Sequence, residues 1–326
     1  MKKVTSKDVA ALAGVSVSAV SRAYRADAPL SDDKRRRVFA AAAKLGYVSR
    51  VDHILSSQSS NTIAMVVGDM RNPFYPTAVD EAARLLSERG LRLILHAVPT
   101  GEDVDLVMRQ VLDYRTEGVI LASSRMGSKL AVKCRQNRIP AVLLNRVQSD
   151  SHMKAVCCDN YGGARMIADR FLRSDRRRIA FIGGQRDTST HLERMRGFTD
   201  HLATNDVRPT VELDGGYSYR QAHAAAQMLL AERPLPEAVF CANDIMAIAL
   251  LDAARMQGIR VPEDIAVAGF DDIPMASWDA YRLTTVRQPL RRMLNLAVDI
   301  LTDPGSDPAE GDIRILPGEL KQRASA

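Results

Sequence analysis

The sequence predicts an α/β protein with two doubly wound parallel-sheet lobes, preceded by a small all-α head. From Thr62 onward, short apolar runs without polar alternation are interleaved with helical stretches, which is typical of strands buried on both faces of a parallel sheet. Before that point, residues 1–48 contain three short amphipathic helical stretches. With 326 residues, of which 46% are hydrophobic and 26% charged, the chain is long enough for two or three folded domains.

The first two helices of the head are predicted from their caps and their apolar spacing. Thr5 can cap a helix, and Asp8 places a carboxylate near its free N–H groups. Gly14 permits the left-handed conformation that ends this helix, and Ser16 caps a second helix that runs to about Tyr24. The short turn between them is the spacing of a helix-turn-helix motif with one shared apolar face. That face comprises Val9, Ala13, Val15, Val20 and Ala23, with the small Ala10 where the helices cross.

The second helix has an outer face that suits the major groove of DNA. Arg22 can donate two hydrogen bonds to guanine, Ser18 can donate or accept, and Val17 can contact a thymine methyl group. The basic run at residues 34–37 is expected to hold phosphates. For any one of these side chains, an ordinary solvated surface position is the alternative. The candidate DNA-binding residues in the head are Thr5, Val17, Ser18, Ser21, Arg22 and the phosphate contact Arg25.

A third helix and the distribution of charge complete the head. Ser31 is a good N-cap, Asp32 and Asp33 suit the positive end of a helix, and Gly46 stops it. Residues 1–50 contain 11 Lys or Arg against 4 Asp, a net charge of +7, whereas the rest of the chain sums to about −1. The excess positive charge therefore lies in one module, as expected for a module that binds a polyanion.

Residues 4–23, "VTSKDVAALAGVSVSAVSRA", and residues 48–60, "VSRVDHILSSQSS", resemble the DNA-binding head and hinge of the LacI/GalR family of bacterial transcription regulators. The resemblance implies a homodimer that binds double-stranded operator DNA. It also implies that the hinge folds on DNA and that Leu55 of each subunit wedges into the minor groove. The hinge departs from the family pattern, with Ser49 where a proline is common and Asp52 near phosphate. An exposed linker leucine is therefore the alternative for Leu55.

The apolar runs after the hinge divide into two lobes, and the family resemblance implies lobes like those of periplasmic sugar-binding proteins. Ligands are expected at the carboxyl ends of the strands in such sheets. The stretch "PLRRMLNLAVDIL" after Gln288 is expected to recross and pack on the first lobe, as it does in the family. The predicted domains are the head at residues 1–48, the hinge at 49–61 and a two-lobed effector-binding and dimerisation domain at 62–326, with lobe 1 at about 62–160 and 289–326 and lobe 2 at about 161–288.

Several residues at predicted strand ends match effector-site positions of the family. Aromatic rings can pack on the C–H face of a sugar or base, while charged and amide groups pair with hydroxyls. Arg146 and Arg194 would also accept a carboxylate or phosphate, so the effector is expected to be a sugar, sugar acid or similar molecule. Asn145 stands where the family more often has Asp, and Arg194→Ala is expected to weaken effector binding without unfolding the protein. The expected effector-binding residues are Asn72, Phe74, Tyr75, Arg146, Arg194, Tyr217, Asn243 and Asp271.

Each of these assignments has a structural alternative. The polar residues can serve only as helix caps, and the aromatic residues can belong to the core or to ordinary cleft lining.

Other classes of protein find little support in the sequence. The four cysteines lack CxxC and zinc-ligand spacing, so buried thiols are expected, with no metal and no cofactor. No GxGxxG, GxxxxGK[ST], GxSxG or HExxH motif occurs, so the protein is not expected to be an enzyme. The chain shows no signal peptide and no apolar stretch of about 18 residues, which predicts a cytoplasmic protein without a membrane partner. The alternative is a sugar-binding protein of the transport type, although the basic head argues against it.

Overall fold

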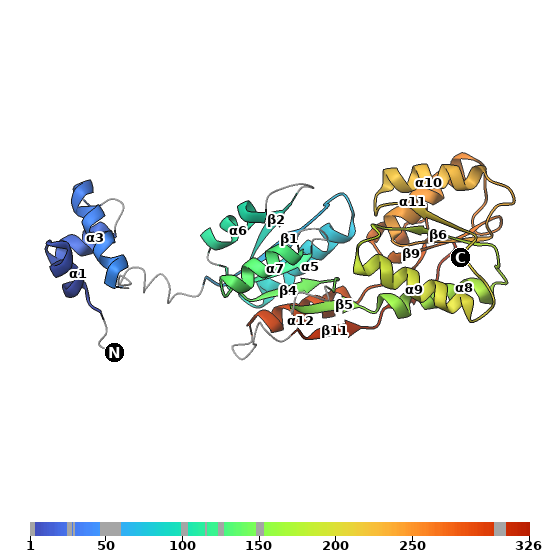
Figure 1. Ribbon diagram of the computed structural model, residues 1–326. Helices are drawn as coiled ribbons and strands as arrows, with labels where there is room; N and C mark the ends of the chain where they lie inside the picture. Colours follow the sequence, from blue (N-terminus) through green and yellow to red (C-terminus); the bar gives the residue numbers. More distant parts are fainter. Residues whose placement is uncertain are drawn as a thin grey trace. The chain divides into compact units, whose positions relative to one another are not determined.

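The structure is a computed structural model that describes residues 4–24, 28, 30–45, 60–98, 104–114, 116–122, 127–147, 153–302 and 311–326. The chain forms two compact units, residues 1–60 and residues 61–326. The described residues of the first unit contain only helices among their regular elements, and the second unit contains two sheets, each covered by helices on both faces (Figure 1). In the described parts of the chain, no helix is both long enough and apolar enough to span a bilayer.

The head consists of α1 (Ser6–Ala13), α2 (Val17–Ala23) and α3 (Asp32–Leu45). The backbone N–H of Thr5 donates to Asp8 Oδ2 at 2.7 Å, and Ser16 Oγ accepts from the backbone of Ala19 at 3.3 Å. Gly14 ends α1 with a φ of 64°, which favours glycine. The predicted helix-turn-helix head is therefore confirmed. Its buried core comprises Val9, Ala10, Ala13, Val20, Ala23, Val38, Ala41 and Ala42.

The first lobe is a six-stranded parallel sheet with helices on both faces. Its elements are β1 (Thr62–Val67), α5 (Phe74–Glu88), β2 (Arg92–Ala97), α6 (Val104–Asp113), β3 (Gly118–Ala122), α7 (Gly127–Gln136), β4 (Ala141–Leu144), β5 (Lys154–Cys158), α12 (Leu290–Thr302) and β11 (Ile313–Leu316). The strand order is β11-β5-β4-β3-β1-β2. Alternate residues of β1 pack in opposite cores, Met65 with α5 and α12, and Val66 with α6 and α7. All six residues of β1 are buried, which explains its uninterrupted apolar run.

The second lobe repeats this arrangement around a sheet with the order β12-β10-β9-β8-β6-β7. Its strands pair in parallel except for β12, which lies antiparallel to β10 at the edge. The elements are α8 (Asn160–Arg173), β6 (Ile179–Gly183), α9 (Ser189–Ala203), β7 (Val211–Asp214), α10 (Tyr219–Ala231), β8 (Ala238–Cys241), α11 (Asp244–Met256), β9 (Ala266–Asp271), the 3-10 turn η1 (Pro274–Ser277), β10 (Thr284–Arg287) and β12 (Glu319–Lys321).

The C-terminal segment crosses between the lobes more often than the sequence predicts. As expected, α12 packs on the first lobe, where it contacts α5, β3, β4 and β5. The chain then forms β11 beside β5 and returns to the second lobe as β12. Ser325 Oγ donates to the carbonyl oxygen of Val267 at 2.6 Å and accepts from the N–H of Thr284 at 2.8 Å. The assignment of the whole range 289–326 to lobe 1 is therefore corrected, because residues 319–326 complete the open edge of the second sheet.

The strand orders determine where a ligand can bind. In each sheet the order reverses beside the first strand of the lobe, between β1 and β3 and between β6 and β8. At such a reversal the loops at the carboxyl ends leave in opposite directions and open a crevice. Residues that follow the carboxyl ends of the strands around these reversals are therefore the ones that the fold gathers at a site.

Candidate functional site

The outer face of α2 carries the residues that were predicted to contact DNA. Val17 is 44% exposed, and Ser18, Ser21 and Arg22 are exposed, as is Thr5 before α1. Arg22 lies one turn beyond Ser18, and its Nη2 donates to Ser18 Oγ at 3.3 Å. These side chains form one continuous polar face with a valine at its N-terminal end, which is the arrangement needed to read base edges.

The structure assigns a structural role to two arginines of the run at residues 34–37. Arg35 donates to the carbonyl oxygen of Ala23 at 2.8 Å, and Arg37 donates to that of Ala13 at 2.7 Å. These carbonyls lie at the ends of α2 and α1, where they lack intrahelical partners. Arg35 and Arg37 therefore stabilise the head, and the expectation that the run contacts phosphate stays a prediction. The other two basic residues of the run are exposed and stay predicted phosphate contacts.

Two of the predicted DNA contacts, Arg25 and Leu55, lie outside the described residues. The predicted hinge at residues 49–61 lies outside them too, except for its last two residues. The roles of Arg25 and Leu55 stay predictions.

A pocket, here called the effector pocket, opens between the two lobes at the carboxyl ends of their strands. The space between its lining residues is about 550 Å³ with the open mouth included. The structure brings seven of the eight predicted effector-binding residues together around it. These residues are Asn72, Phe74, Tyr75, Arg146, Arg194, Tyr217 and Asp271.

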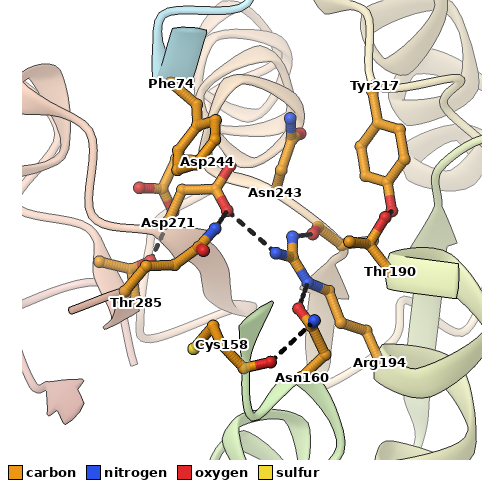
Figure 2. A network of polar contacts seen from close by, with 12 residues as sticks. Phe74, Cys158, Asn160, Thr190, Arg194, Tyr217, Asn243, Asp244, Asp271 and Thr285 are labelled. Atoms are coloured by element: carbon orange, nitrogen blue, oxygen red, sulfur yellow. Dashed lines mark hydrogen bonds and ion pairs between the residues drawn. The ribbon is translucent and has the colours of Figure 1, made fainter. Parts of the chain in front are cut away.

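Arg194 is the centre of a buried polar network at this pocket (Figure 2). Its side chain is 2% exposed and donates to Asn160 Oδ1 at 2.8 Å, to the carbonyl oxygen of Ala242 at 2.5 Å and to Asp271 Oδ1 at 3.1 Å. Its Cζ also lies 3.7 Å from the ring centroid of Phe270. A buried charge is tolerated only when it is paired and hydrogen-bonded. Arg194 therefore links α8, the residue after β8 and the end of β9, and it also lines the pocket.

Two buried carboxyl groups lie in this network. Asp271 Oδ1 also accepts from Gln288 Nε2 at 2.7 Å, whereas Asp244 accepts from Thr285 Oγ1 at 2.5 Å and from the N–H of Ile273 at 2.8 Å. Burial is the main cause that raises the pKa of Asp271. Burial is the main cause that raises the pKa of Asp244 to about 8, and the negative charge of Asp271 is the second cause. At neutral pH Asp244 therefore keeps its proton, and the negative charge of the pair lies on Asp271, which faces Arg194.

The raised pKa of Asp244 predicts a pH-dependent stability. The folded state holds this proton up to about pH 8, whereas the usual pKa is 3.8. The stabilisation is therefore complete below the usual pKa and is lost as the pH rises through the folded pKa. We expect the melting temperature of the protein to fall between about pH 4 and about pH 8 and to level off above that. Asp244→Asn keeps the size of the side chain but cannot ionise, so it should flatten this fall. Equal pH profiles for the two proteins would contradict the assignment.

Tyr217 is held against the pocket by its backbone and its hydroxyl group. It adopts a φ of 57°, and its hydroxyl lies 3.1 Å from Thr190 Oγ1. A Cβ atom at Gly184 would overlap the Tyr217 ring, so the ring rests directly on the backbone there. Burial raises the pKa of Tyr217, so its hydroxyl stays a neutral donor or acceptor. The ring is thus a fixed wall on which a planar or puckered ring can pack.

Asn243, the eighth predicted residue, is not among those that line the pocket. It is the N-cap of α11, where its Oδ1 accepts from the N–H of Met246 at 3.2 Å, and it is 1% exposed. Its Nδ2 has no hydrogen-bond partner among the described residues. The structure thus gives Asn243 the capping role, and a role toward the effector stays a prediction.

Five residues of the pocket lining were not predicted from the sequence. Four of them follow strands closely, so the strand-end argument could have found them if it had been applied to every strand. Thr190 lies within α9, and only the packing of that helix reveals it. The five are Asp69, Asn145, Gln185, Thr190 and Gly216.

No metal centre is evident in the described parts of the chain. They contain no cluster of three His, Cys, Asp or Glu side chains that could hold an ion. All four cysteines are buried free thiols. Burial raises the pKa of Cys134, Cys157 and Cys158 to about 12, so these thiols stay protonated and unreactive.

Known protein families match both units of the chain. A model of bacterial regulatory proteins of the lacI family matches residues 5–49, and a model of the periplasmic binding protein-like domain matches residues 168–326. The transcriptional regulator CelR of Thermobifida fusca is 32% identical, with 94% of each chain covered. The ribose operon repressor of Escherichia coli K12 is 29% identical, with 99% of each chain covered. These relatives match from the head to the C-terminal lobe, which supports a transcription regulator and not the transport-type alternative.

Two solved structures resemble this chain in three-dimensional structure as well as in sequence. The lac repressor dimer bound to operator and the anti-inducer ONPF is 26% identical, with a TM-score of 0.74 and 99% of each chain covered. The complex of CelR with cellobiose is 31% identical, with a TM-score of 0.73, and covers 99% of this chain and 100% of that one.

Proposed function

Because the chain belongs to the lacI family of bacterial regulatory proteins, we propose that it is a repressor whose affinity for operator DNA is switched by a small hydroxylated metabolite bound between its lobes. The chain is a DNA-binding transcription regulator, as its relatives are. The observation that carries the proposed switch is the effector pocket. Aromatic, amide and charged side chains from both lobes meet there, as a hydroxylated ligand requires.

Operator binding follows from the head and from dimerisation. The similar lac repressor binds its operator as a dimer, and we propose that two copies of this chain do the same. Two heads then occupy two half-sites, with Arg22, Ser18 and Val17 at base edges. The exposed basic residues of the head neutralise phosphates, which gives affinity without sequence preference.

The proposed switch depends on the segments of the chain that connect the two lobes. The chain passes from one lobe to the other between β5 and α8, between β10 and α12 and between β11 and β12. A ligand that contacts Arg146 in the first lobe and Asp271 in the second stabilises one closure of the lobes over another. The similar CelR protein binds cellobiose, which supports a sugar or sugar derivative as the effector here. Only a difference in ligand affinity between the two closures can change DNA binding.

We propose that the pocket binds its ligand without transforming it. We also propose that the protein acts in the cytoplasm, where the operator DNA is. A general base must have a free lone pair aimed at the substrate. Asp271 is engaged by Arg194 and Gln288, and Asp244 is turned toward Thr285 and is not among the residues that line the pocket. Asp244 is therefore a structural residue, and Asp271, whose Oδ1 is held by Arg194 and Gln288, is proposed to contact the ligand without acting as a base.

Fluorescence anisotropy with the DNA upstream of the protein's own gene tests this function. We expect the full-length protein to bind one segment about a thousandfold or more tighter than a scrambled duplex. The affinity should fall steeply between about 50 and 200 mM salt, because phosphate contacts release counterions. A sugar-sized ligand that raises the melting temperature should also change operator affinity. Equal affinity for both duplexes would disprove the regulator function, and a bound ligand without effect on DNA binding would disprove the switch.

A further inference from the structure

Two Asp and two Arg side chains line the effector pocket, but their ion pairs leave one arginine without a partner among the described residues. Asp271 is paired with Arg194 at 3.1 Å. Asp69 is paired with the exposed Arg71, whose Nε lies 2.8 Å from Asp69 Oδ1. Arg146 forms no ion pair with any residue that the structure describes, and its Nη2 reaches only the Tyr75 hydroxyl, at 3.5 Å. Among the described residues, Arg146 is therefore the charged side chain of the lining that lacks an ion-pair partner, and it is half-buried.

Unused hydrogen-bond acceptors lie in the same pocket lining as this cation. Asn145 Oδ1 and Gln185 Oε1 are buried and have no hydrogen-bond partner among the described residues. Both residues line the pocket with Arg146. Leaving buried acceptors unpaired is costly, and ligand hydroxyl groups would satisfy them. The pocket lining therefore suits a ligand that supplies hydroxyl donors and one negatively charged group.

We propose that the effector is a sugar-sized polyol that carries a carboxylate or phosphate, and that Arg146 holds this anionic group. The inference rests on the proposed function, since it names the ligand class of the same pocket. A guanidinium can donate two parallel hydrogen bonds to either anion, and such charge-assisted pairs are about twice as strong as neutral ones. A neutral sugar of the same shape leaves the charge of Arg146 unpaired.

Asn145 provides a nearly isosteric variant that tests the charge alone. It directly follows β4, has a φ of 59°, and its N–H donates to the carbonyl oxygen of Val156 at 2.8 Å. Asparagine and aspartate both tolerate this left-handed conformation, so Asn145→Asp keeps the backbone. The new carboxylate would sit beside Arg146, neutralise it and repel an anionic ligand.

Calorimetric titration of the full-length protein with matched pairs of ligands tests the proposal. The carboxylate arm compares gluconate and galacturonate with glucose and galactose, and the phosphate arm compares glucose 6-phosphate and ribose 5-phosphate with glucose and ribose. We expect at least one anion to bind at least about tenfold tighter than its neutral partner. Arg146→Gln and Asn145→Asp should each weaken that anion about tenfold or more and leave the melting temperature of the free protein unchanged.

Arg186→Gln is the matched control, because Arg186 is exposed beside Gln185 but is not among the residues that line the pocket. It should leave anion affinity within about twofold, since exposed charges are screened by salt. A neutral sugar that binds as tightly as its anion, an anion whose affinity survives Arg146→Gln, or the failure of every anion to bind would overturn the proposal. Operator binding measured on the same preparations without ligand shows separately whether the proposed function holds.

Discussion

Replacing Arg194 by alanine is expected to lower the free energy of unfolding by about 3–5 kcal/mol, because it removes the ion-pair partner of the buried Asp271. The substitution also takes a donor from Asn160 Oδ1 and from the carbonyl oxygen of Ala242. The structure thus revises the expectation that Arg194→Ala weakens effector binding without unfolding the protein. Chemical denaturation of the full-length protein without ligand measures this loss.

The double variant Arg194→Ala/Asp271→Asn separates the charge from the other contacts. If the loss of stability comes mainly from a buried carboxylate left without its cation, making residue 271 neutral should recover part of the stability lost in the single variant. A loss of less than about 1 kcal/mol in Arg194→Ala would show that the network does not hold the second lobe together. Strict additivity of the two substitutions would show that Arg194 and Asp271 are not energetically coupled.

Replacing Arg22 by alanine is expected to cost about 1–3 kcal/mol of discrimination between the operator and a scrambled duplex. The reason is that Arg22 is exposed on the outer face of α2, where its guanidinium can form two hydrogen bonds to one base. Among the described residues, its side chain donates hydrogen bonds only to Ser18 on its own helix, so the head should stay folded. Anisotropy with both duplexes measures the change, and ligand affinity of the free protein should be unaffected.

Lys34→Ala is the matched control for the Arg22 variant. Lys34 is exposed on α3, where it is a predicted phosphate contact. Its loss should weaken binding to operator and to scrambled DNA alike and reduce the salt dependence by about one phosphate contact. If Arg22→Ala behaved in this same uniform way, Arg22 would be a phosphate contact and not a reader of bases.

The sequence by itself determined the layers of the fold and the general location of the site. A strand flanked by helices on both faces must be apolar along its whole length, as β1 is, and this pattern is local. Helix caps are local too, which is why Thr5, Gly14 and Ser16 delimit α1 and α2 as predicted. Because the carboxyl ends of parallel strands converge, residues as distant as Asn72 and Asp271 line one pocket.

Only the tertiary structure decided which partner each polar side chain takes. Arg194 and Asp271 are far apart in sequence, and so are Arg37 and the carbonyl of Ala13 at the end of α1. Likewise, β12 joins the second sheet because an open strand edge is available there, not because of its own residue pattern. A guanidinium has the same local sequence signal whether it binds a ligand, a phosphate or a carbonyl oxygen. The choice among them depends on which unpaired acceptors folding brings within reach, and that is a property of the packed chain alone.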